Sequence, residues 1–272
     1  MRIPRIYVPI VLKTGDFVTL DSQASVHISR VLRLKKNDPV VVFNGQGGEY
    51  EGVIAEIDKR AVSVVLNLFN DRTVESPLLI SLVQAVSRSD RMDFTLQKAV
   101  ELGVHDIIPL ISQHTAFTVK GTRADKKHQH WQGIVHSACE QSGRTLIPTV
   151  QAIVDFSTWL DAQRVEHQGL EGEGLGSQEL NHQPLHNAGK ATTTKILLDH
   201  RADQRLNQLE APANHRVMLL VGPEGGFSES EISAVQGVGF TGVGLGPRVL
   251  RTETAALSVI SALQLLWGDF GA

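Results

Sequence analysis

The chain has 272 residues, of which 42% are hydrophobic and 20% are charged, so it is long enough for one large domain or two modest ones. No apolar stretch approaches the roughly 18 residues of a membrane-spanning helix, which favours a soluble globular protein over a membrane protein. A formal net charge of −3 gives no overall sign of nucleic-acid binding, although a balanced total can conceal a local basic patch.

Residues 1–70 contain short apolar runs separated by turn residues, a pattern that predicts a small β-barrel. Met1 leads almost directly into a strand-like run, so we expect no signal peptide. One helix is expected at Ser22–Val31. The strand candidates are Val18–Leu20, Val40–Asn44, Tyr50–Ile57 and Val62–Leu68.

Basic side chains gather at the end of this expected helix and near the start of the chain. They are Arg30, Arg33, Lys35 and Lys36, together with Arg2 and Arg5. One interpretation is an ordinary solvated face with cations at a helix C-terminus. The other is a patch that contacts phosphates. The residues alone leave both interpretations open.

A polar linker is expected at Asp71–Ser76, and beyond it strands alternate with helices. Leu78–Val86 and Ile107–Ile111 are predicted strands. The helix Met92–Leu102 lies between them and ends at Gly103. This order predicts a parallel α/β sheet with right-handed crossovers.

Residues 122–141 combine a segment rich in Lys and His with an amphipathic pattern. The histidine spacing suits no metal-ligand set, so Thr122–His130 is expected to be a solvated helix start and no metal is expected. Trp131–Gln141 continues as a helix that ends near Gly143.

Cys139 is the only cysteine, which excludes an intrachain disulfide and fits a reducing cytoplasm. We expect a small buried side chain there and not a nucleophile. Glu140, Gln141 and Arg144 follow the apolar part of the helix and are candidates to face a cleft.

Gln163–Thr194 is rich in Gly, Gln, His and Asn and has little apolar periodicity. A flexible surface insertion is expected there. Lys195–Asp199 then resumes a strand. His200 and Arg201 follow at its carboxyl end, where open α/β sheets bind ligands.

The stretch Val217–Leu266 contains the same unit twice: a short apolar run, a loop with Gly and Pro, and a helix. In the first unit, the strand Val217–Val221 is followed by the loop Gly222–Phe227. Ser228 and Glu231 then fit the S-x-x-E capping box of a helix.

In the second unit, the strand Gly242–Leu245 is followed by the loop Gly246–Arg251, and the helix opens near Thr252. Two such loops at the carboxyl ends of neighbouring strands predict a cleft. Neither G-x-x-x-x-G-K-[ST] nor a strand followed by G-x-G-x-x-G is present. Backbone groups and apolar side chains in these loops suit an adenine or a small neutral group better than a triphosphate. Two ordinary βα turns explain the pattern as well.

The sequences GPEGGFSESE and LGPRVLRTETAAL resemble the C-terminal signature of the SPOUT superfamily of methyltransferases, and more narrowly that of the RsmE family. The resemblance continues in RVLRLKKND (residues 30–38), RMDFTLQKAVELGV (91–104) and HSACEQSGR (136–144). It covers nearly the whole chain except residues 163–190.

This resemblance implies a PUA-like RNA-binding β-barrel at residues 1–72. Residues 73–272 would form a SPOUT domain with a mostly parallel sheet, a C-terminal trefoil knot and the flexible insertion at about 163–194. The family methylates N3 of one uridine in small-subunit (16S) ribosomal RNA and uses S-adenosylmethionine. The implied substrate is the free RNA or the assembled 30S subunit in the cytoplasm. The implied assembly is a homodimer through the knotted domain, for which the apolar helix Ala255–Trp267 is a candidate interface.

Three sets of site residues follow from the resemblance. For the cofactor they are Leu198, Leu220, Gly222, Gly225, Leu245, Gly246, Leu250 and Thr252. For RNA they are Arg2, Arg5, Arg30, Arg33, Arg88 and Lys98. For catalysis they are Arg251 and Glu224.

Arg251 is expected to stabilise the developing uridine anion, because an arginine stays protonated and is a poor base. The alternative is a salt bridge from Arg251 to Glu253 or Glu224. Glu224 is a candidate base for the N3 proton, and the alternative is a carboxylate that only orients its loop before the helix N-terminus. Two rival functions are methylation at another RNA position or at a ribose 2′-O, and RNA binding in ribosome assembly without catalysis.

Overall fold

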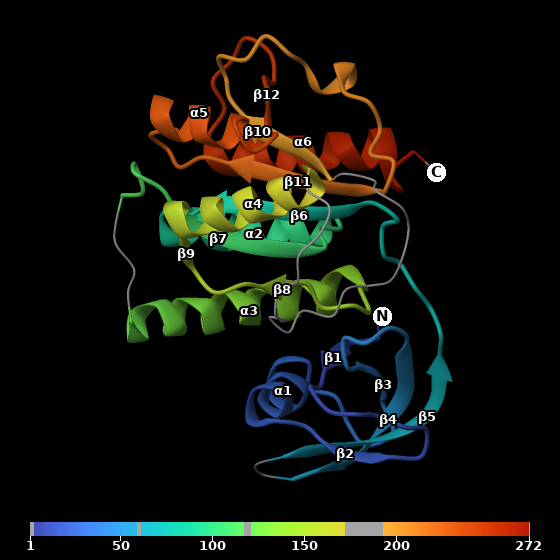
Figure 1. Ribbon diagram of the computed structural model, residues 1–272. Coiled ribbons are helices and arrows are strands. Elements are labelled where there is room, and N and C mark those ends of the chain that lie inside the picture. The colour runs from blue at the N-terminus through green and yellow to red at the C-terminus, as the bar shows by residue number, and fades with distance from the viewer. Residues whose placement is uncertain (1–2, 59–60, 117–120, 172–192, 272) are drawn as a thin grey trace. The chain divides into compact units, whose positions relative to one another are not determined.

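The computed structural model describes residues 3–58, 61–116, 121–171 and 193–271 (Figure 1). The chain divides into two compact units. Unit 1 consists of Met1–Glu75 and Gly133–Ile147, and unit 2 consists of Ser76–Gln132 and Pro148–Ala272. Gly133–Ile147 thus belongs to unit 1, although the expected domain limits placed it in the second domain.

Unit 1 contains a five-stranded sheet in the order β1-β3-β4-β5-β2. β1 runs parallel to β3, and the other neighbours are antiparallel. Within the described residues β1 and β2 do not pair with each other, so the sheet is an open half-barrel and not the complete barrel that we expected. The strands are β1 (Arg5–Tyr7), β2 (Phe17–Thr19), β3 (Pro39–Phe43), β4 (Glu49–Ile57) and β5 (Val62–Asn70).

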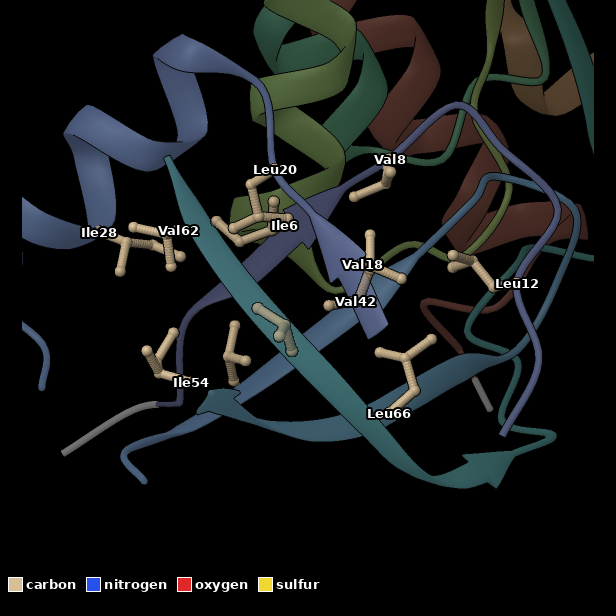
Figure 2. Close-up of a cluster of buried hydrophobic side chains, with 12 residues drawn as sticks. Ile6, Val8, Leu12, Val18, Leu20, Ile28, Val42, Ile54, Val62 and Leu66 are labelled. Atoms are coloured by element: carbon tan, nitrogen blue, oxygen red, sulfur yellow. The ribbon is translucent and has the colours of Figure 1, made fainter. Parts of the chain in front are cut away.

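The core of unit 1 is built from alternate strand positions, because successive side chains of a strand point to opposite faces. Val62 and Leu66 of β5 lie in one buried cluster with Ile54 of β4 and Val42 of β3 (Figure 2). The expected helix is present as α1 (Ser22–Val26) and a π-helical turn, η1 (His27–Val31). It adds Ile28 to the same cluster.

Unit 2 is organised around a seven-stranded sheet whose neighbouring strands are all parallel. Its order is β12-β10-β11-β6-β7-β8, and β9 also pairs with β7. The five strands that the sequence predicted in this unit are confirmed within one or two residues. Their apolar runs suit a sheet that is covered on both faces. The strands are β6 (Leu79–Ala85), β7 (Asp106–Ile111), β8 (Thr149–Val150), β9 (Val154–Asp155), β10 (Thr194–Leu198), β11 (Arg216–Val221) and β12 (Thr241–Val243).

Five α-helices and a short 3₁₀ helix accompany this sheet in the described residues, and none of them is long and apolar enough to cross a membrane. α4 and α5 share a buried cluster with Val83, Leu197 and Leu220 of the sheet. α2 and α6 pack against each other, and α6 also contacts β11. The helices are α2 (Ser89–Glu101), α3 (Thr122–Ser142), α4 (Phe156–Glu171), η2 (Leu206–Gln208), α5 (Glu229–Gln236) and α6 (Thr252–Trp267).

Gln264 ties the end of α6 to the end of α2. Its amide Nε2 donates to the Leu102 carbonyl at 3.0 Å, and its Oε1 accepts from the Ser76 hydroxyl at 2.7 Å. Gly103 has a φ of +86°, and a Cβ there would lie 2.7 Å from Gln264 Nε2. Glycine is therefore required both by the backbone conformation and by this close approach.

The expected insertion at Gln163–Thr194 is only partly outside regular structure. α4 continues to Glu171, and Thr194 already begins β10. Gln163 is buried, and Leu160 one turn earlier packs in the core, so packing of this face extends the helix beyond the predicted boundary. Residues 172–192 lie outside the described residues.

Candidate functional site

A cavity of about 480 Å³ lies where three neighbouring parallel strands of unit 2 end. The segments that follow β10, β11 and β12 line it, and these strands are adjacent in the sheet (Figure 1). Carboxyl ends of parallel strands are the usual place for a ligand in an α/β sheet. The lining residues are Arg91, Leu198–Arg201, Val221–Phe227, Ile232, Val243, Leu245, Arg248–Thr252 and Ala255.

The loop Gly222–Phe227 is held by the cap of α5, by a buried side chain and by a turn within the loop. Ser228 caps α5 by accepting from the Glu231 backbone N–H, and the Glu231 carboxylate accepts from the Ser228 N–H at 2.9 Å, so the predicted capping box is confirmed. Phe227 is buried in the core beside this cap. The Gly226 N–H donates to the Pro223 carbonyl at 2.9 Å, which closes a tight turn. The loop backbone is thus presented to the cavity in a defined shape.

Thr252 connects the two predicted loops. Its hydroxyl donates to the Gly222 carbonyl at 2.7 Å and accepts from Gln84 Nε2 at 3.1 Å. Gln84 is fully buried on β6, so the start of α6 is anchored both to the neighbouring loop and to the sheet. Leu245 and Leu250 provide apolar surface on this side of the cavity.

Arg91 forms ion pairs with two carboxylates at the cavity. Its Nη1 lies 3.0 Å from Glu224 Oε1, and its Nε lies 3.9 Å from Glu253 Oε1. The expected alternative, a salt bridge from Arg251 to either of these carboxylates, is therefore not formed. Arg251 is exposed, and within the described residues its guanidinium has no hydrogen bond or ion pair. Arg251 thus lines the cavity with a charge that no described side chain pairs.

Asp199, His200 and Arg201 follow β10, and all three line the cavity, as their position after a strand predicted. The Arg201 guanidinium donates to Asp199 at 3.1 Å and also to Glu229. These hydrogen bonds, first of all the one to Asp199, raise the pKa of Arg201. The charges on this side of the cavity are therefore paired.

Most of the residues expected to hold the cofactor lie together at this cavity. Leu220 and Gly246 are the two exceptions. Leu220 is fully buried in β11, and Gly246 is not among the lining residues. The expected catalytic residues, Arg251 and Glu224, both line the cavity. The lining residues from the cofactor set are Leu198, Gly222, Gly225, Leu245, Leu250 and Thr252.

The basic residues expected to contact RNA differ in exposure and in whether they form a salt bridge. Arg30 and Arg33 are exposed at the end of the unit 1 helix, and Arg88 is exposed just before α2. Lys98 forms a salt bridge with Glu101 at 2.8 Å, one turn away on the same helix. Arg2 lies outside the described residues.

Arg5 is buried, and its position does not fit a phosphate contact. Its Nε donates to Glu49 at 3.0 Å, and its Nη1 and Nη2 donate to the carbonyls of Cys139 and Arg144 at 2.6 and 3.0 Å. Burial lowers the pKa of Arg5. All of these partners belong to unit 1, where Arg5 joins the first strand to Gly133–Ile147.

The stretch HSACEQSGR supports unit 1 and does not line the cavity. Arg144 is buried and pairs with Glu75 at 2.6 Å, and Glu140 accepts from the Tyr7 N–H at 2.9 Å. The interpretation that Glu140 and Arg144 face the cleft is therefore wrong. Cys139 is buried, as expected, and burial raises the pKa of its thiol to about 12. A thiol that stays protonated is a poor nucleophile.

The sequence did not identify Arg91 as a functional residue, although RMDF was part of the resemblance. Its partners are far away in the chain, and Glu224 is separated from it by 133 residues. The three histidines of α3 are engaged separately: His128 with the Val150 carbonyl, His130 with Asp93, and His136 with the Tyr7 ring. Within the described residues, no group of three or more His, Cys, Asp or Glu side chains is arranged to hold a metal ion.

Two family models match this chain. Residues 74–264 match a family model described as an RNA methyltransferase domain, and residues 20–67 match an RNA methyltransferase PUA domain. A ribosomal RNA small subunit methyltransferase E from Buchnera aphidicola subsp. Schizaphis graminum is 36% identical over 268 residues, which is 98% of each chain. A protein of the same name from Bacillus subtilis is 28% identical over 89% of each chain.

Two solved structures also cover nearly the whole chain. The ribosomal RNA small subunit methyltransferase E from Neisseria gonorrhoeae, bound to S-adenosyl methionine, has a TM-score of 0.82 and 36% identity, and it covers 99% of this chain and 100% of its own. A methyltransferase from Legionella pneumophila, in complex with the bound cofactor SAM, has a TM-score of 0.84 and 33% identity over the same shares of the two chains.

Proposed function

Because this chain belongs to the ribosomal RNA small subunit methyltransferase E family, we propose that it transfers a methyl group from S-adenosylmethionine to N3 of one uridine in small-subunit (16S) ribosomal RNA. The observation that carries this proposal is the cavity at the ends of β10, β11 and β12. It has paired charges at Arg91 and Glu224, whereas Arg251 has no ion pair among the residues that the structure describes. The reaction belongs in the cytoplasm, where ribosomal RNA is modified in bacteria.

The residues of the cavity fit S-adenosylmethionine. Its volume of about 480 Å³ lies in the range of small-molecule sites. Leu245 and Leu250 offer apolar surface for an adenine ring, and the backbone of Gly222 and Gly225 offers hydrogen-bonding groups. A Cβ at Gly222 would lie 3.2 Å from Phe227, and a Cβ at Gly225 would lie 3.1 Å from His114. Both glycines therefore let the loop backbone form the cavity wall.

When bound, S-adenosylmethionine supplies an electrophilic methyl group on a positively charged sulfur. The chain must orient the uracil and accept negative charge as N3 loses its proton. Arg251 is exposed at the cavity and unpaired within the described residues, so its guanidinium can contact the uracil anion. Glu224 is the candidate acceptor of the proton. Its Oε1 is held by Arg91, which fixes the carboxylate at the cavity.

We also infer that the C-terminal segment forms the trefoil knot of the SPOUT fold. β12 lies at the sheet edge beyond β10, whereas Thr252 contacts Gly222, which follows β11, and Gln84 of β6. Between Val243 and Thr252 the chain must therefore cross back past the segment that follows β10. Such a crossing supports a threaded chain.

The RNA interface is proposed to use Arg30, Arg33 and Arg88, because their side chains are exposed. A homodimer is proposed through the knotted part of unit 2. Leu265 and Leu266 near the end of α6 support it, because they are 62% and 46% exposed although they are apolar.

The test of the function is transfer of radiolabelled methyl from S-adenosylmethionine to small-subunit particles that lack the modification, followed by nucleoside analysis. Label in 3-methyluridine is the expected result. Label in a 2′-O-methylated nucleoside or in another base would contradict the N3 assignment. An absence of both label and cofactor binding would favour a non-catalytic RNA-binding protein.

Arg251→Ala tests the catalytic assignment in the same assay. We expect kcat to fall about 100-fold, the effect of removing one donor to a developing anion, with little change in cofactor affinity. Arg164→Ala is the matched control, because Arg164 is an exposed arginine of α4 that pairs with Asp161 and does not line the cavity. Full kcat in Arg251→Ala would refute the role.

A further inference from the structure

The segment that follows β7 contacts the cavity loop without lining the cavity. The Ser112 N–H donates to the Thr115 hydroxyl at 2.9 Å, and the Thr115 N–H donates to the Ser112 carbonyl at 3.1 Å. This closed turn projects the two residues between them. The Gln113 N–H donates to Glu231 at 2.8 Å, the residue that completes the cap of α5. The turn is thus fixed beside the end of the cavity loop.

His114 extends from this turn to the cavity loop. Its Nδ1 lies 3.0 Å from the Gly226 carbonyl oxygen. A carbonyl can only accept a hydrogen bond, so Nδ1 must carry the proton and donate it. Both the Nδ1–H tautomer and the imidazolium satisfy this requirement.

His114 also packs against Gly225. A Cβ at Gly225 would lie 3.1 Å from the Cβ of His114, which is tighter than nine in ten real Cβ contacts, and 3.6 Å from its Cγ, an ordinary contact distance. The φ of Gly225 is not positive, so its backbone conformation is open to alanine. The need for glycine at this position therefore comes from His114 and not from the loop conformation.

We propose that His114 is a positioning residue of the methyl-transfer reaction, which holds the Gly225–Gly226 backbone of the cavity loop in the shape that binds S-adenosylmethionine. This inference rests on the proposed function, because the loop is assigned to the cofactor there. His114 acts through the loop and not on the reacting atoms, since it does not line the cavity. It should consequently affect cofactor binding more than the rate of the chemical step.

The test compares His114→Ala with His114→Asn, because the asparagine amide can donate from nearly the position of Nδ1. Loss of one hydrogen bond predicts a rise of about 3- to 10-fold in the Kd and KM for S-adenosylmethionine in His114→Ala. His114→Asn should restore most of the affinity. At saturating cofactor, kcat should change by less than about twofold, since the transition-state contacts remain. His105→Ala is the control, an exposed histidine of unit 2 outside the cavity.

A second variant separates contact with His114 from general loss of structure. Gly225→Ala should weaken cofactor binding in the wild-type background and weaken it less in a His114→Gly background, because the 3.1 Å contact is with the Cβ of His114, which only glycine lacks. Additive effects of the two changes would overturn the inference, and so would an unchanged Kd in His114→Ala. If the wild-type protein itself fails to bind S-adenosylmethionine in calorimetry, the proposed function falls together with this inference.

Discussion

The hydroxyl of Thr252 offers a sharp test of how the cavity is held together. Thr252→Val replaces this hydroxyl with a methyl group of similar size and keeps the branched Cβ, so the packing of a buried position is preserved. Only the two hydrogen bonds of the hydroxyl are removed, the one donated to Gly222 and the one accepted from Gln84.

The loss of unfolding free energy follows from the two groups that lose a hydrogen bond, Gln84 Nε2 and the Gly222 carbonyl. Gln84 Nε2 keeps a hydrogen bond to the Ala85 carbonyl at 3.0 Å, so its loss is partly offset. The Gly222 carbonyl is half-buried and loses its side-chain donor. One lost hydrogen bond together with a partly desolvated carbonyl predicts a decrease of about 1–2 kcal/mol in the free energy of unfolding.

Urea unfolding of three variants measures this difference. Thr252→Ser keeps the hydroxyl and should lie closer to the wild type than Thr252→Val does. Thr254→Val is the control for placing valine on α6, because Thr254 is exposed two residues further along the same helix. The reasoning fails if Thr252→Val and Thr254→Val have the same unfolding free energy within about 0.5 kcal/mol, the usual range for surface changes.

Three further substitutions test the capping box, the buried ion pair and the buried thiol. Ser228→Ala removes the cap of α5 and should cost about 1 kcal/mol in urea unfolding, whereas Ser228→Asp should retain most of the stability. Glu75→Ala removes the carboxylate that pairs with buried Arg144 and should cost about 3 kcal/mol, and a loss below about 1 kcal/mol would contradict the structural role of that pair. The Cys139 thiol has a pKa raised from 9.0 to about 12, so between these pH values the folded chain binds a proton that the unfolded chain has lost. Wild-type stability should therefore fall as pH rises above 9, and in Cys139→Ala the fall should be shallower when unfolding is followed at pH 8, 9 and 10.

Features that depend on neighbouring residues were predictable from the sequence. Val217–Val221 is a continuous apolar run, and the structure confirms a buried strand there. Ser228 and Glu231 are three residues apart, so their capping box could be recognised in the pattern. Burial of Cys139 followed from the chemistry of a lone cysteine. Strand positions and helix starts are local properties, since they depend on periodicity and on hydrogen bonds across a few residues.

Short or atypical elements were less predictable. β1 has only three residues, and its parallel pairing with β3 depends on a segment more than thirty residues away in the chain. α4 extended into a segment whose composition indicated a loop, because Gln163 is buried and Leu160 packs in a cluster with residues of the unit 2 sheet. In both cases tertiary packing decided against the local pattern.

The partner of each charged side chain was decided by tertiary structure alone. Arg5 looked like part of a basic surface patch, but contacts to Glu49 and to the carbonyls of Cys139 and Arg144 bury it inside unit 1. Arg91 was inconspicuous in the sequence, and its pairing with Glu224 leaves Arg251 at the cavity without an ion pair in the described part of the chain. The sequence by itself determined where the strands and loops lie and which loops carry the site, because those depend on neighbouring residues. Which charges are neutralised there depends on segments more than a hundred residues apart, which meet only when the parallel sheet brings its carboxyl ends together.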